Sequence, residues 1–323
     1  MQLLKQNIAP TVYWKKYRNY LMAIKTMKIS FQFTYAGSGS DIWTYSIAEQ
    51  LRQNGIDTSV QVFPHHFQYY PYLLSCITKK NDADIIHTNS WSGCGFHQQG
   101  IPHVTTEHLV VHDDLVTPYK TLPQKLFHKA VYQHEKLAFN KASSITAVSE
   151  YSASKVQQYF NKPAIAIQNG IDINKFIISD RKENLHPAGK NKIKLLFAGN
   201  FSRRKGADLL PKIMKELGDK FVLFTTTGLQ DKTVSEASNI ISIGKLNQNE
   251  LIEFYNYCDI FLFPTKYEPF GNVIIEAMNY ENVVITTEFC GGGEILNQDL
   301  IMKSSDDYSI VDKIDDLLEN NDK

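Results

Sequence analysis

The sequence predicts an α/β protein made of two Rossmann-like domains. Three observations support this fold class: short apolar runs alternate with amphipathic segments, the alternation occurs as two series, and the two halves differ in charge. Residues 1–180 carry 17 basic and 12 acidic side chains, net +5, whereas residues 181–323 carry 17 basic and 22 acidic ones, net −5. We expect two parallel sheets that face each other across a cleft, with ligands at the carboxyl ends of the strands.

The first domain is expected over residues 27–180, and its elements follow from residue type and spacing. Runs rich in Val, Ile, Phe and Thr predict strands, and apolar residues at helical spacing predict helices. The expected strands are 28–35, 58–63, 84–88, 103–106, 144–148 and 164–168. The expected helices are 41–54, 123–142 and 150–160.

The second domain is expected over residues 193–323 and repeats the same alternation. Residues 181–192 contain Pro187 and Gly189 and have no clear periodicity, so we expect them to form the linker. The expected strands of the second domain are 194–198, 221–226, 240–243, 259–263 and 283–286. The expected helices are 207–217, 249–258 and 272–280.

The overall composition excludes several classes of protein. Lys plus Arg and Asp plus Glu both total 34, so a generally basic nucleic-acid binder is not expected. The longest apolar run, residues 20–24, is far shorter than the roughly 20 residues that cross a membrane, and no signal peptide is recognisable. The four cysteines are too widely spaced for a CxxC site, and reduced thiols are expected. These features favour a cytoplasmic protein.

The first 26 residues form a basic extension that precedes the first expected strand. Residues 1–40 contain six basic side chains and no acidic one, and Tyr13, Tyr17 and Leu21 recur at helical spacing. Such a segment suits peripheral contact with an anionic membrane. A dispensable extension is the open alternative, because Met27 resembles a natural start before the first strand.

Each domain opens with a strand, a glycine-bearing loop and a helix. In the first domain the loop contains Gly37 and Gly39, which allow a tight turn and close approach to an anion at a helix N-terminus. In the second domain Arg203, Arg204 and Lys205 precede the expected helix. Cations at a helix start are electrostatically misplaced unless an anion binds there, and a diphosphate suits them. For both loops, an ordinary solvated turn is the alternative.

The most informative segment follows the strand at 259–263. Glu268 lies in the loop after that strand, and Glu276 lies one turn inside the next helix. Two carboxylates at different heights suit a ligand that carries sugar hydroxyls, and the amides near Phe270 suit an anion. A second glycine-rich turn, residues 290–294, follows downstream. It is expected either to approach the ligand or simply to connect two elements.

These motifs together resemble those of a known family. The segment from Glu268 to Glu276 resembles the E-x7-E motif of the retaining GT-B glycosyltransferases of family 4. Other family-like pieces occur in the same order along the chain, from about residue 27 to residue 316. They are the glycine loop 36–41, the strand ends 84–89 and 105–108, the "VS" pair 148–149, the "NGID" run 169–172 and the "RKG" run 204–206.

The resemblance implies a role for each matching residue. Arg204 and Lys205 are expected on the donor diphosphate, Glu276 on the nucleotide ribose, and Glu268 near the donor sugar and the reacting centre. The backbone of Phe270, Gly271 and Asn272 is expected to face the sugar and the diphosphate. Gly37 and Gly39 are expected to close against the diphosphate from the other domain. His108 is expected beside the donor sugar, and the turn at Leu246 is expected to hold the base.

The implied reaction is sugar transfer with retention of anomeric configuration. The donor is expected to be a nucleotide sugar, with UDP favoured, and the acceptor a saccharide or a lipid-linked saccharide. The leaving phosphate can accept the acceptor proton, while Glu268 and the Arg204–Lys205 pair stabilise opposite charges. No metal ion and no cofactor are expected. The pathway expected is surface polysaccharide or lipopolysaccharide synthesis.

Two departures from the family pattern keep alternatives open. Asn200 stands where relatives commonly have Arg, with Arg203 as a substitute, and the helix that usually crosses back to the first domain is expected to be missing. A non-catalytic relative that binds a nucleotide sugar or supports a partner transferase is therefore one alternative. An NAD-linked oxidoreductase or an epimerase is another, although a full GxGxxG motif and a well-placed acid are absent.

Overall fold

The computed structural model describes residues 27–78, 82–173, 184–227, 237–302 and 307–321. The basic extension 1–26 and residues 181–183 of the expected linker lie outside the described residues. The chain divides into two compact units. The first comprises Met1–His108 and Leu126–Thr146, and the second comprises Leu109–Lys125 and Ala147–Lys323.

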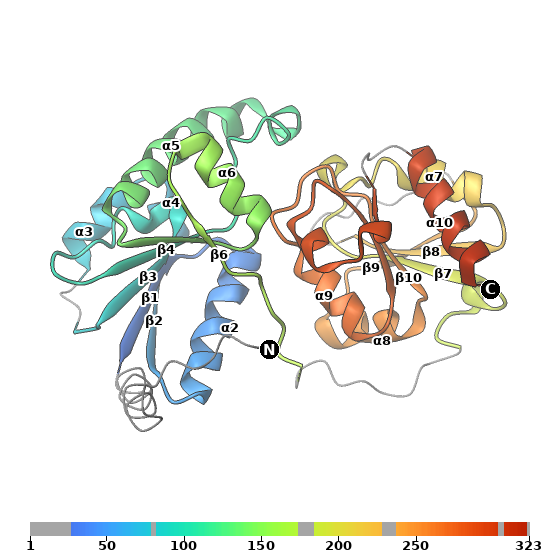
Figure 1. Cartoon of the computed structure of the whole chain (residues 1–323), viewed down its shortest axis with the longest axis horizontal. Coiled ribbons are helices and arrows are strands. Elements are labelled where there is room, and N and C mark those ends of the chain that lie inside the picture. The colour runs from blue at the N-terminus through green and yellow to red at the C-terminus, as the bar shows by residue number, and fades with distance from the viewer. Residues whose placement is uncertain (1–26, 79–81, 174–183, 228–236, 303–306, 322–323) are drawn as a thin grey trace, which may run out of the picture. The chain divides into compact units, whose positions relative to one another are not determined.

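The first sheet has six parallel strands in the order β2-β1-β3-β4-β5-β6 (Figure 1). Helix α2 covers one face of this sheet, and α3, α4 and α5 lie on the other. The strands are β1 Lys28–Thr34, β2 Asp57–Phe63, β3 Ile85–Asn89, β4 His103–Glu107, β5 Ser144–Ala147 and β6 Ile165–Ala166. The helices are α2 Gly39–Gln53, α3 Leu74–Ile77, α4 Ser90–Gly93, α5 Leu122–Lys141 and α6 Glu150–Phe160.

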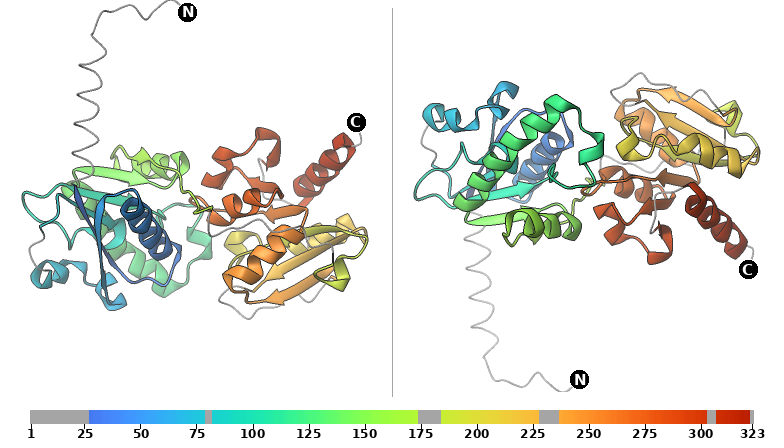
Figure 2. Two further views of the ribbon diagram at one scale, coloured as in Figure 1. Left: turned by 90° about the horizontal axis from the view of Figure 1, so that it is seen from below. Right: turned by 90° about the horizontal axis from the view of Figure 1, so that it is seen from above.

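The second sheet also has six parallel strands, in the order β12-β11-β10-β7-β8-β9. Helices α8 and α9 cover one face, and α7 and α10 lie together on the other (Figures 1 and 2). The strands are β7 Ile193–Phe197, β8 Phe221–Thr226, β9 Ile240–Gly244, β10 Ile260–Phe263, β11 Val283–Thr287 and β12 Ile301–Met302. The helices are α7 Leu210–Leu217, α8 Gln248–Tyr257, α9 Asn272–Asn279 and α10 Asp307–Asn321.

Burial explains why these residues form these elements. Every residue of β8 and of β10 is buried, as expected for central strands of a sheet covered on both faces. Helix α7 buries four apolar side chains at helical spacing, and Gly218 ends it with a positive φ of 74°. The four buried residues are Leu210, Ile213, Met214 and Leu217. The core of the second unit therefore lies between β7, β8, β10 and the helices that cover them.

The strand order reverses at one place in each sheet, next to the first strand. β1 pairs with both β2 and β3, and β7 pairs with both β8 and β10. In open parallel sheets, ligands bind beyond the carboxyl ends of the strands at this reversal. In the first sheet, the loops there follow Thr34 and Asn89. In the second sheet they follow Phe197 and Phe263.

Most strands expected from the sequence are confirmed to within a few residues. The expected helix at 207–217 is wrong at its start, because α7 begins only at Leu210, with Pro211 in its first turn. The basic residues Arg203–Lys205 form a separate 3₁₀ turn before it. Gly206 separates the two with φ of 75°, and a Cβ there would lie 2.0 Å from the carbonyl oxygen of Pro264. Strand β12 and helix α10 were not expected, and α10 packs through Ile310 and Ile314. None of the helices in the described part of the chain has the length and apolar character needed to span a bilayer.

Candidate functional site

The loop after β7 carries the basic residues of the site. Thr226 at the end of β8 accepts a hydrogen bond from the amide of Gly199 at 2.9 Å, which fixes the start of this loop. The 3₁₀ turn Arg203–Lys205 is capped by Ser202, whose hydroxyl accepts from the amide of Lys205. Gly199 has φ of 140°, and a Cβ there would lie 3.1 Å from the Lys205 ammonium. A glycine at this position thus leaves room for the lysine side chain.

Two cations of this loop converge on one carboxylate. Glu268 Oε2 lies 3.4 Å from Arg204 Nη1 and 3.7 Å from Lys205 Nζ. All three side chains are mostly buried, so this cluster is screened less than a surface ion pair. The Lys205 ammonium also lies 5.4 Å from the ring centre of Phe263 at the end of β10. Arg204, Lys205 and Glu268, which the sequence proposed for one ligand, are therefore neighbours.

The loop that carries Glu268 is held by hydrogen bonds to consecutive carbonyl groups. The Arg204 guanidinium donates to the carbonyl of Tyr267, and the amide of Gly291 donates to that of Glu268 at 2.9 Å. The amide of Gly292 donates to the carbonyl of Phe270 at 2.8 Å, and the thiol of Cys290 does so at 3.3 Å. The carboxylate thus stands on a backbone whose position is fixed by its surroundings.

The glycine-rich turn at 291–293 is buried and close-packed. A Cβ on Gly291 would lie 1.9 Å from the carbonyl oxygen of Pro269, and one on Gly292 would lie 2.3 Å from that of Phe270. Only glycine permits so close an approach of two backbones. The sequence left open whether this turn approaches a ligand or connects elements, and the structure shows that it packs against the loop of Glu268 (residues 264–271).

Phe270, Gly271 and Asn272 form the junction between this loop and α9. The Phe270 side chain is 2% exposed, so only its backbone is available to a ligand. Gly271 has φ of 83° and is the N-cap of α9, and its carbonyl accepts from the amide of Ile274 at 2.9 Å. The amides of Asn272 and Val273 precede this bond and can face a ligand. The Asn272 side-chain oxygen accepts a hydrogen bond from Asn169 at 2.8 Å, which links the "NGID" run to the start of α9.

Glu276 lies on the first turns of α9 and is bound to Tyr255 of α8. The phenol of Tyr255 donates to Glu276 Oε2 at 2.9 Å, and Tyr255 itself is fully buried. Burial raises the pKa of Glu276 above its ordinary value, and the hydrogen bond from Tyr255 opposes this shift. Sequence reasoning missed Tyr255, because it lies 21 residues before Glu276 and has no motif of its own.

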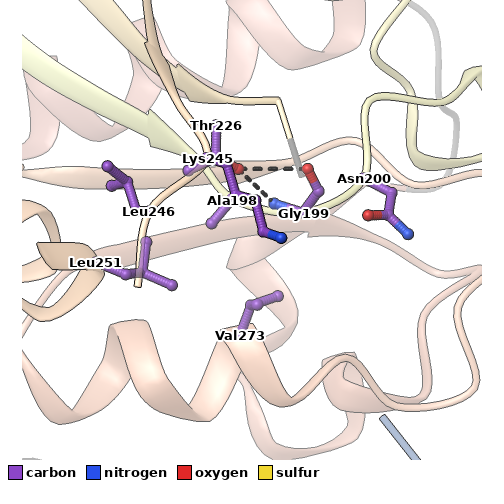
Figure 3. A pocket seen from close by; sticks show the side chains of 8 residues that line it. All are labelled: Ala198, Gly199, Asn200, Thr226, Lys245, Leu246, Leu251 and Val273. Carbon is purple, nitrogen blue, oxygen red and sulfur yellow. Dashed lines mark hydrogen bonds between the residues drawn. The ribbon is translucent and has the colours of Figure 1, made fainter. Parts of the chain in front are cut away.

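A cavity of about 230 Å³ lies beside these residues in the second unit (Figure 3). Leu246, Leu251 and Val273 supply an apolar part of its lining, and the hydrogen-bonded pair Thr226 and Gly199 supplies a polar part (Figure 3). The other lining residues are Ala198, Asn200 and Lys245. Leu246, proposed from the sequence to lie near a base, is thus part of the lining of this cavity.

The glycine loop of the first unit has a different electrostatic character. Asp41, only 4% exposed, accepts hydrogen bonds from the amides of Ala36 at 2.9 Å and Gly37 at 2.7 Å. Gly37 has φ of 66°, and nothing lies within 4 Å of a Cβ built on Gly39. The amides of Ala36 and Gly37 therefore already bind a carboxylate from the first turn of α2. Those of Ser38 and Gly39 come next along the loop.

His108 follows β4 in the first unit and is held by two neighbours. Its Nε2 lies 3.1 Å from the side-chain oxygen of Asn89, and its ring meets Trp43 edge to face at 4.8 Å. Burial lowers the pKa of His108 to about 3, with a smaller effect from His87. The imidazole is therefore neutral near pH 7, and Nε2 donates to Asn89. Trp43 and Asn89 were not singled out as site residues by the sequence.

The candidate residues thus form two groups. His108, Gly37 and Gly39 lie in the first unit, and the remaining candidates lie in the second. The second group combines two cations, two carboxylates, free helix amides and a partly apolar cavity. Such a set can bind an anion with a hydroxyl-bearing and a flat apolar part. Across the described residues, no three His, Cys, Asp or Glu side chains are gathered as a metal ion would require.

Comparison with protein families identifies two matching stretches. Residues 58–175 match the family described as "Glycosyltransferase Family 4", and residues 178–323 match the family described as "Glycosyl transferases group 1". These two stretches together cover most of the chain, and the second contains Arg204, Lys205, Glu268 and Glu276.

Curated relatives are similar over long stretches at modest identity. An uncharacterized glycosyltransferase of Methanocaldococcus jannaschii is 26% identical over 86% of this chain and 80% of its own length. CapM of Staphylococcus aureus, a capsular polysaccharide biosynthesis glycosyltransferase, is 28% identical over 58% of this chain and 55% of its own. The phosphatidyl-myo-inositol mannosyltransferase of Mycobacterium tuberculosis is 24% identical over 64% and 55%.

Solved structures share the fold at lower identity. Sucrose-phosphate synthase from Thermosynechococcus elongatus has a TM-score of 0.72 at 18% identity, covering 91% of this chain and 90% of its own. HepE from Anabaena, solved in complex with UDP-glucose, has a TM-score of 0.68 at 17% identity, with coverage of 92% and 91%. WaaG, involved in lipopolysaccharide biosynthesis, has a TM-score of 0.64 at 15% identity, with 90% of both chains covered.

Proposed function

This chain belongs to the family 4 glycosyltransferases and has the GT-B fold, and we propose its function on that basis. We propose that it transfers a sugar from a nucleotide-sugar donor to a saccharide or lipid-linked acceptor, with retention of anomeric configuration. The observation that carries the proposal is the cluster of Arg204, Lys205 and Glu268. In this cluster, two cations that can neutralise a departing nucleoside diphosphate lie beside one carboxylate, which we place near the reacting sugar.

The diphosphate is proposed to bind Arg204, Lys205 and the first amides of α9. Without a ligand, Glu268 is the anion that these cations contact. A diphosphate brings more negative charge than one carboxylate and forms shorter, charge-assisted hydrogen bonds. We therefore propose that it displaces Glu268 from the cations, which leaves the carboxylate available to the sugar. No divalent cation is required in this scheme, because protein groups neutralise the leaving group.

The nucleoside is proposed to bind along Glu276 and the cavity beside it. One oxygen of Glu276 accepts from Tyr255, and the other is proposed to accept from the ribose hydroxyls. The base is proposed to lie against Leu246 and Val273, which line the cavity. UDP is the proposed nucleotide, supported by the complexes of HepE from Anabaena with UDP and UDP-glucose.

Catalysis is proposed to depend on charge stabilisation at fixed positions. As the donor bond breaks, positive charge develops on the sugar and negative charge on the diphosphate. Glu268 faces the first charge, and Arg204 with Lys205 faces the second, on a backbone held by hydrogen bonds. Such preorganised groups need little rearrangement during the reaction. The leaving phosphate is proposed to accept the acceptor proton, and the roles of His108, Gly37 and Gly39 stay predictions.

The acceptor is proposed to be part of a surface glycan, which agrees with the biosynthetic role printed for CapM. Contact with an anionic membrane is proposed on two grounds. Leu122, Leu126 and Leu137 of α5 are 76%, 69% and 50% exposed, and lysines lie between them in the sequence. In addition, Tyr69, Tyr70 and Tyr72 are about half exposed. Exposed apolar groups among cations suit an anionic bilayer surface.

The proposal is tested by thermal unfolding with a panel of UDP-, GDP-, ADP- and dTDP-sugars and NAD, without metal. A ligand at 100 times its Kd should stabilise the chain by about 2.7 kcal/mol. We expect one nucleotide-sugar class to stabilise the parent and to lose its effect in Lys205→Ala. In Glu276→Gln the nucleotide should bind less tightly while inorganic pyrophosphate binds as before, because Glu276 is assigned to the ribose.

Two results would contradict the proposal. Stabilisation by NAD alone would favour an oxidoreductase. Binding of a nucleotide sugar without transfer to any glycan or hydrolysis of the donor would favour the non-catalytic alternative, for which Asn200 in the loop after β7 is the observation in support.

A further inference from the structure

The first turn of α6 contacts the loop that carries Glu268. Ser149 is the N-cap of α6, and its hydroxyl donates to the carbonyl oxygen of Pro269 at 2.6 Å. Ser152, one turn further along α6, donates to the same oxygen at 3.2 Å. Both serines are buried, at 0% and 2% exposure, so bulk water does not compete for their hydrogen bonds to Pro269. Two buried donors thus hold one carbonyl that directly follows Glu268.

Helix α6 is itself fastened at the same end. Glu294, which follows the buried glycine turn, accepts hydrogen bonds from the amides of Glu150 at 3.0 Å and Tyr151 at 2.5 Å. A carboxylate at a helix N-terminus is favourable because it satisfies free amides and opposes the helix dipole. The two sides of the α6 N-terminus therefore contact residues 269 and 294, which flank the loop and the glycine turn.

Ser149, Pro269 and Gly291 are packed in close contact with one another. A Cβ on Gly291 would lie 2.4 Å from Ser149 Oγ and 1.9 Å from the Pro269 oxygen, so three backbone segments meet here. The position of Pro269 is thus set from one side by Ser149 and from the other by Gly291. Since Glu268 and Pro269 are consecutive and the proline ring restricts the backbone between them, a shift of the Pro269 carbonyl also moves the Glu268 Cα and its side chain.

We propose that Ser149 and Ser152 are positioning residues for Glu268: their hydroxyls fix the Pro269 carbonyl and thereby hold the Glu268 carboxylate at the reacting centre. The proposal rests on the proposed function for its catalytic consequence. According to this proposal, residues at the start of α6, which lie outside the donor-binding segments, affect the reaction rate. It predicts that losing the two hydroxyls lowers kcat while nucleotide binding, which depends on Lys205 and Glu276, is unaffected.

The test compares Ser149→Ala, Ser152→Ala and the double variant with a matched control, Ser154→Ala. Ser154 lies on the same helix, and its hydroxyl donates to the carbonyl of Tyr151 at 2.7 Å, on the exposed side. We expect the double variant to lose kcat by about tenfold to a hundredfold, because small displacements of a catalytic group have effects of this size. Its Kd for UDP should stay within about twofold of the parent, since charge-assisted contacts to the diphosphate are intact.

Ser152→Ala separates positioning from helix capping. It removes one donor to Pro269 and leaves the Ser149 cap in place, so a loss of kcat in this variant cannot come from an uncapped helix. It also remains informative if the double variant fails to fold. Parental kcat in folded Ser152→Ala and Ser149→Ala, equal to that of Ser154→Ala, would overturn the proposal.

A second readout separates failure of this proposal from failure of the proposed function. Amide hydrogen exchange of residues 264–271 needs no substrate. We expect faster exchange over this segment in the Ser149 and Ser152 variants and unchanged exchange in Ser154→Ala. If the parent transfers no sugar but exchange responds in this way, the proposed function fails and the structural part of the positioning role stands. If exchange is unchanged, the positioning role is overturned whatever the activity.

Discussion

The loops after β1 and after β7 occupy the same topological place and have opposite electrostatic character. Each follows the first strand of its sheet at the reversal of strand order, and each contains a glycine with positive φ. In the first, Asp41 takes the amides of Ala36 and Gly37. In the second, Arg204 and Lys205 contact Glu268, a carboxylate from another loop.

The origin of the carboxylate in each loop indicates which loop can bind an external anion. Asp41 lies in the first turn of α2, directly after the glycine loop, and is almost fully buried, so an anion that approaches the amides bound to Asp41 must displace a buried carboxylate. Glu268 comes from a separate loop, and the same ligand that displaces it brings a sugar for it to bind. Topology thus creates two similar positions, and the source of the internal carboxylate distinguishes them.

The largest expected effect on kcat comes from neutralising Glu268, the carboxylate that contacts the loop after β7. In Glu268→Gln we expect kcat to fall by about 10² to 10³, the range for loss of one preorganised electrostatic contact in an active site. The Kd for UDP should stay equal or decrease, because the cations lose a competing anion. Steady-state kinetics and calorimetric titration measure the two quantities, with exposed Glu216→Gln on α7 as control. A weaker affinity for UDP with unchanged kcat would contradict the assignment.

The next effect concerns buried ionisable groups of the first unit. Burial lowers the pKa of His108 to about 3 and those of His87 and His103 to about 4, and it raises that of Glu135 to about 8. Below the ordinary histidine value of about 6.5 the unfolded chain binds three protons more on these histidines and one fewer on Glu135. The net difference approaches two protons near pH 5.5, so stability should fall by about 2 kcal/mol as pH decreases from 6.5 to 5.5.

Above pH 6.5 the sign reverses. As the histidines lose their protons in the unfolded chain, the raised pKa of Glu135 becomes the main effect among these four groups, because the folded chain keeps a proton that the unfolded chain has lost, and stability should fall slowly up to about pH 8. Thermal unfolding at about pH 5.5, 6.5 and 8.0 measures this profile. Glu135→Gln should remove the alkaline decline and leave the acid one. A Tm that is independent of pH would contradict the burial of these groups.

A smaller effect, on the free energy of unfolding, is expected from changes to Asp41 beside the loop after β1. Asp41→Ala removes the acceptor for two amides and should lower the free energy of unfolding by about 2 kcal/mol, whereas Asp41→Asn keeps an acceptor and should cost about 1 kcal/mol. Neither variant should change the Kd for UDP by more than about twofold, because the loop is occupied internally. Denaturant unfolding and UDP titration test this. Much tighter UDP binding in Asp41→Asn would mean that this loop also binds the diphosphate.

Much of the fold was predictable because parallel, fully covered strands leave a strong sequence signal. The runs at 221–226 and 260–263 are apolar or β-branched and fully buried, and they were identified almost to the residue. β12 has only two residues, which is too short for a recognisable pattern, and α10 was not among the expected helices. The start of α7 was placed at 207 because Ala207 and Leu209 pack on the same core as the helix and so fit its apolar pattern.

The site was predictable where it is local and not where it depends on distant contacts. Glu268 and Glu276 share one motif, and Arg204 and Lys205 share another, so spacing was enough to select them. The partners Tyr255 and Ser149 lie 21 and 120 residues from the groups they bind, and no spacing rule connects them. Nor did the sequence indicate that Asp41 occupies the amides of the Gly37 loop, because a carboxylate after a glycine turn also fits the first turn of a helix.

Titration of UDP against the parent, Lys205→Ala and Arg203→Ala tests the central claim most directly. Lys205 is mostly buried beside Glu268, whereas Arg203 in the same turn is 81% exposed at its side chain and lies 3.7 Å from Asp208. We predict that Lys205→Ala raises the Kd about tenfold to a hundredfold, as expected for one charge-assisted contact, and that Arg203→Ala changes it less than threefold or so. Equal losses in both variants, or an unchanged Kd in Lys205→Ala, would contradict the claim that the loop after β7 is the built diphosphate site.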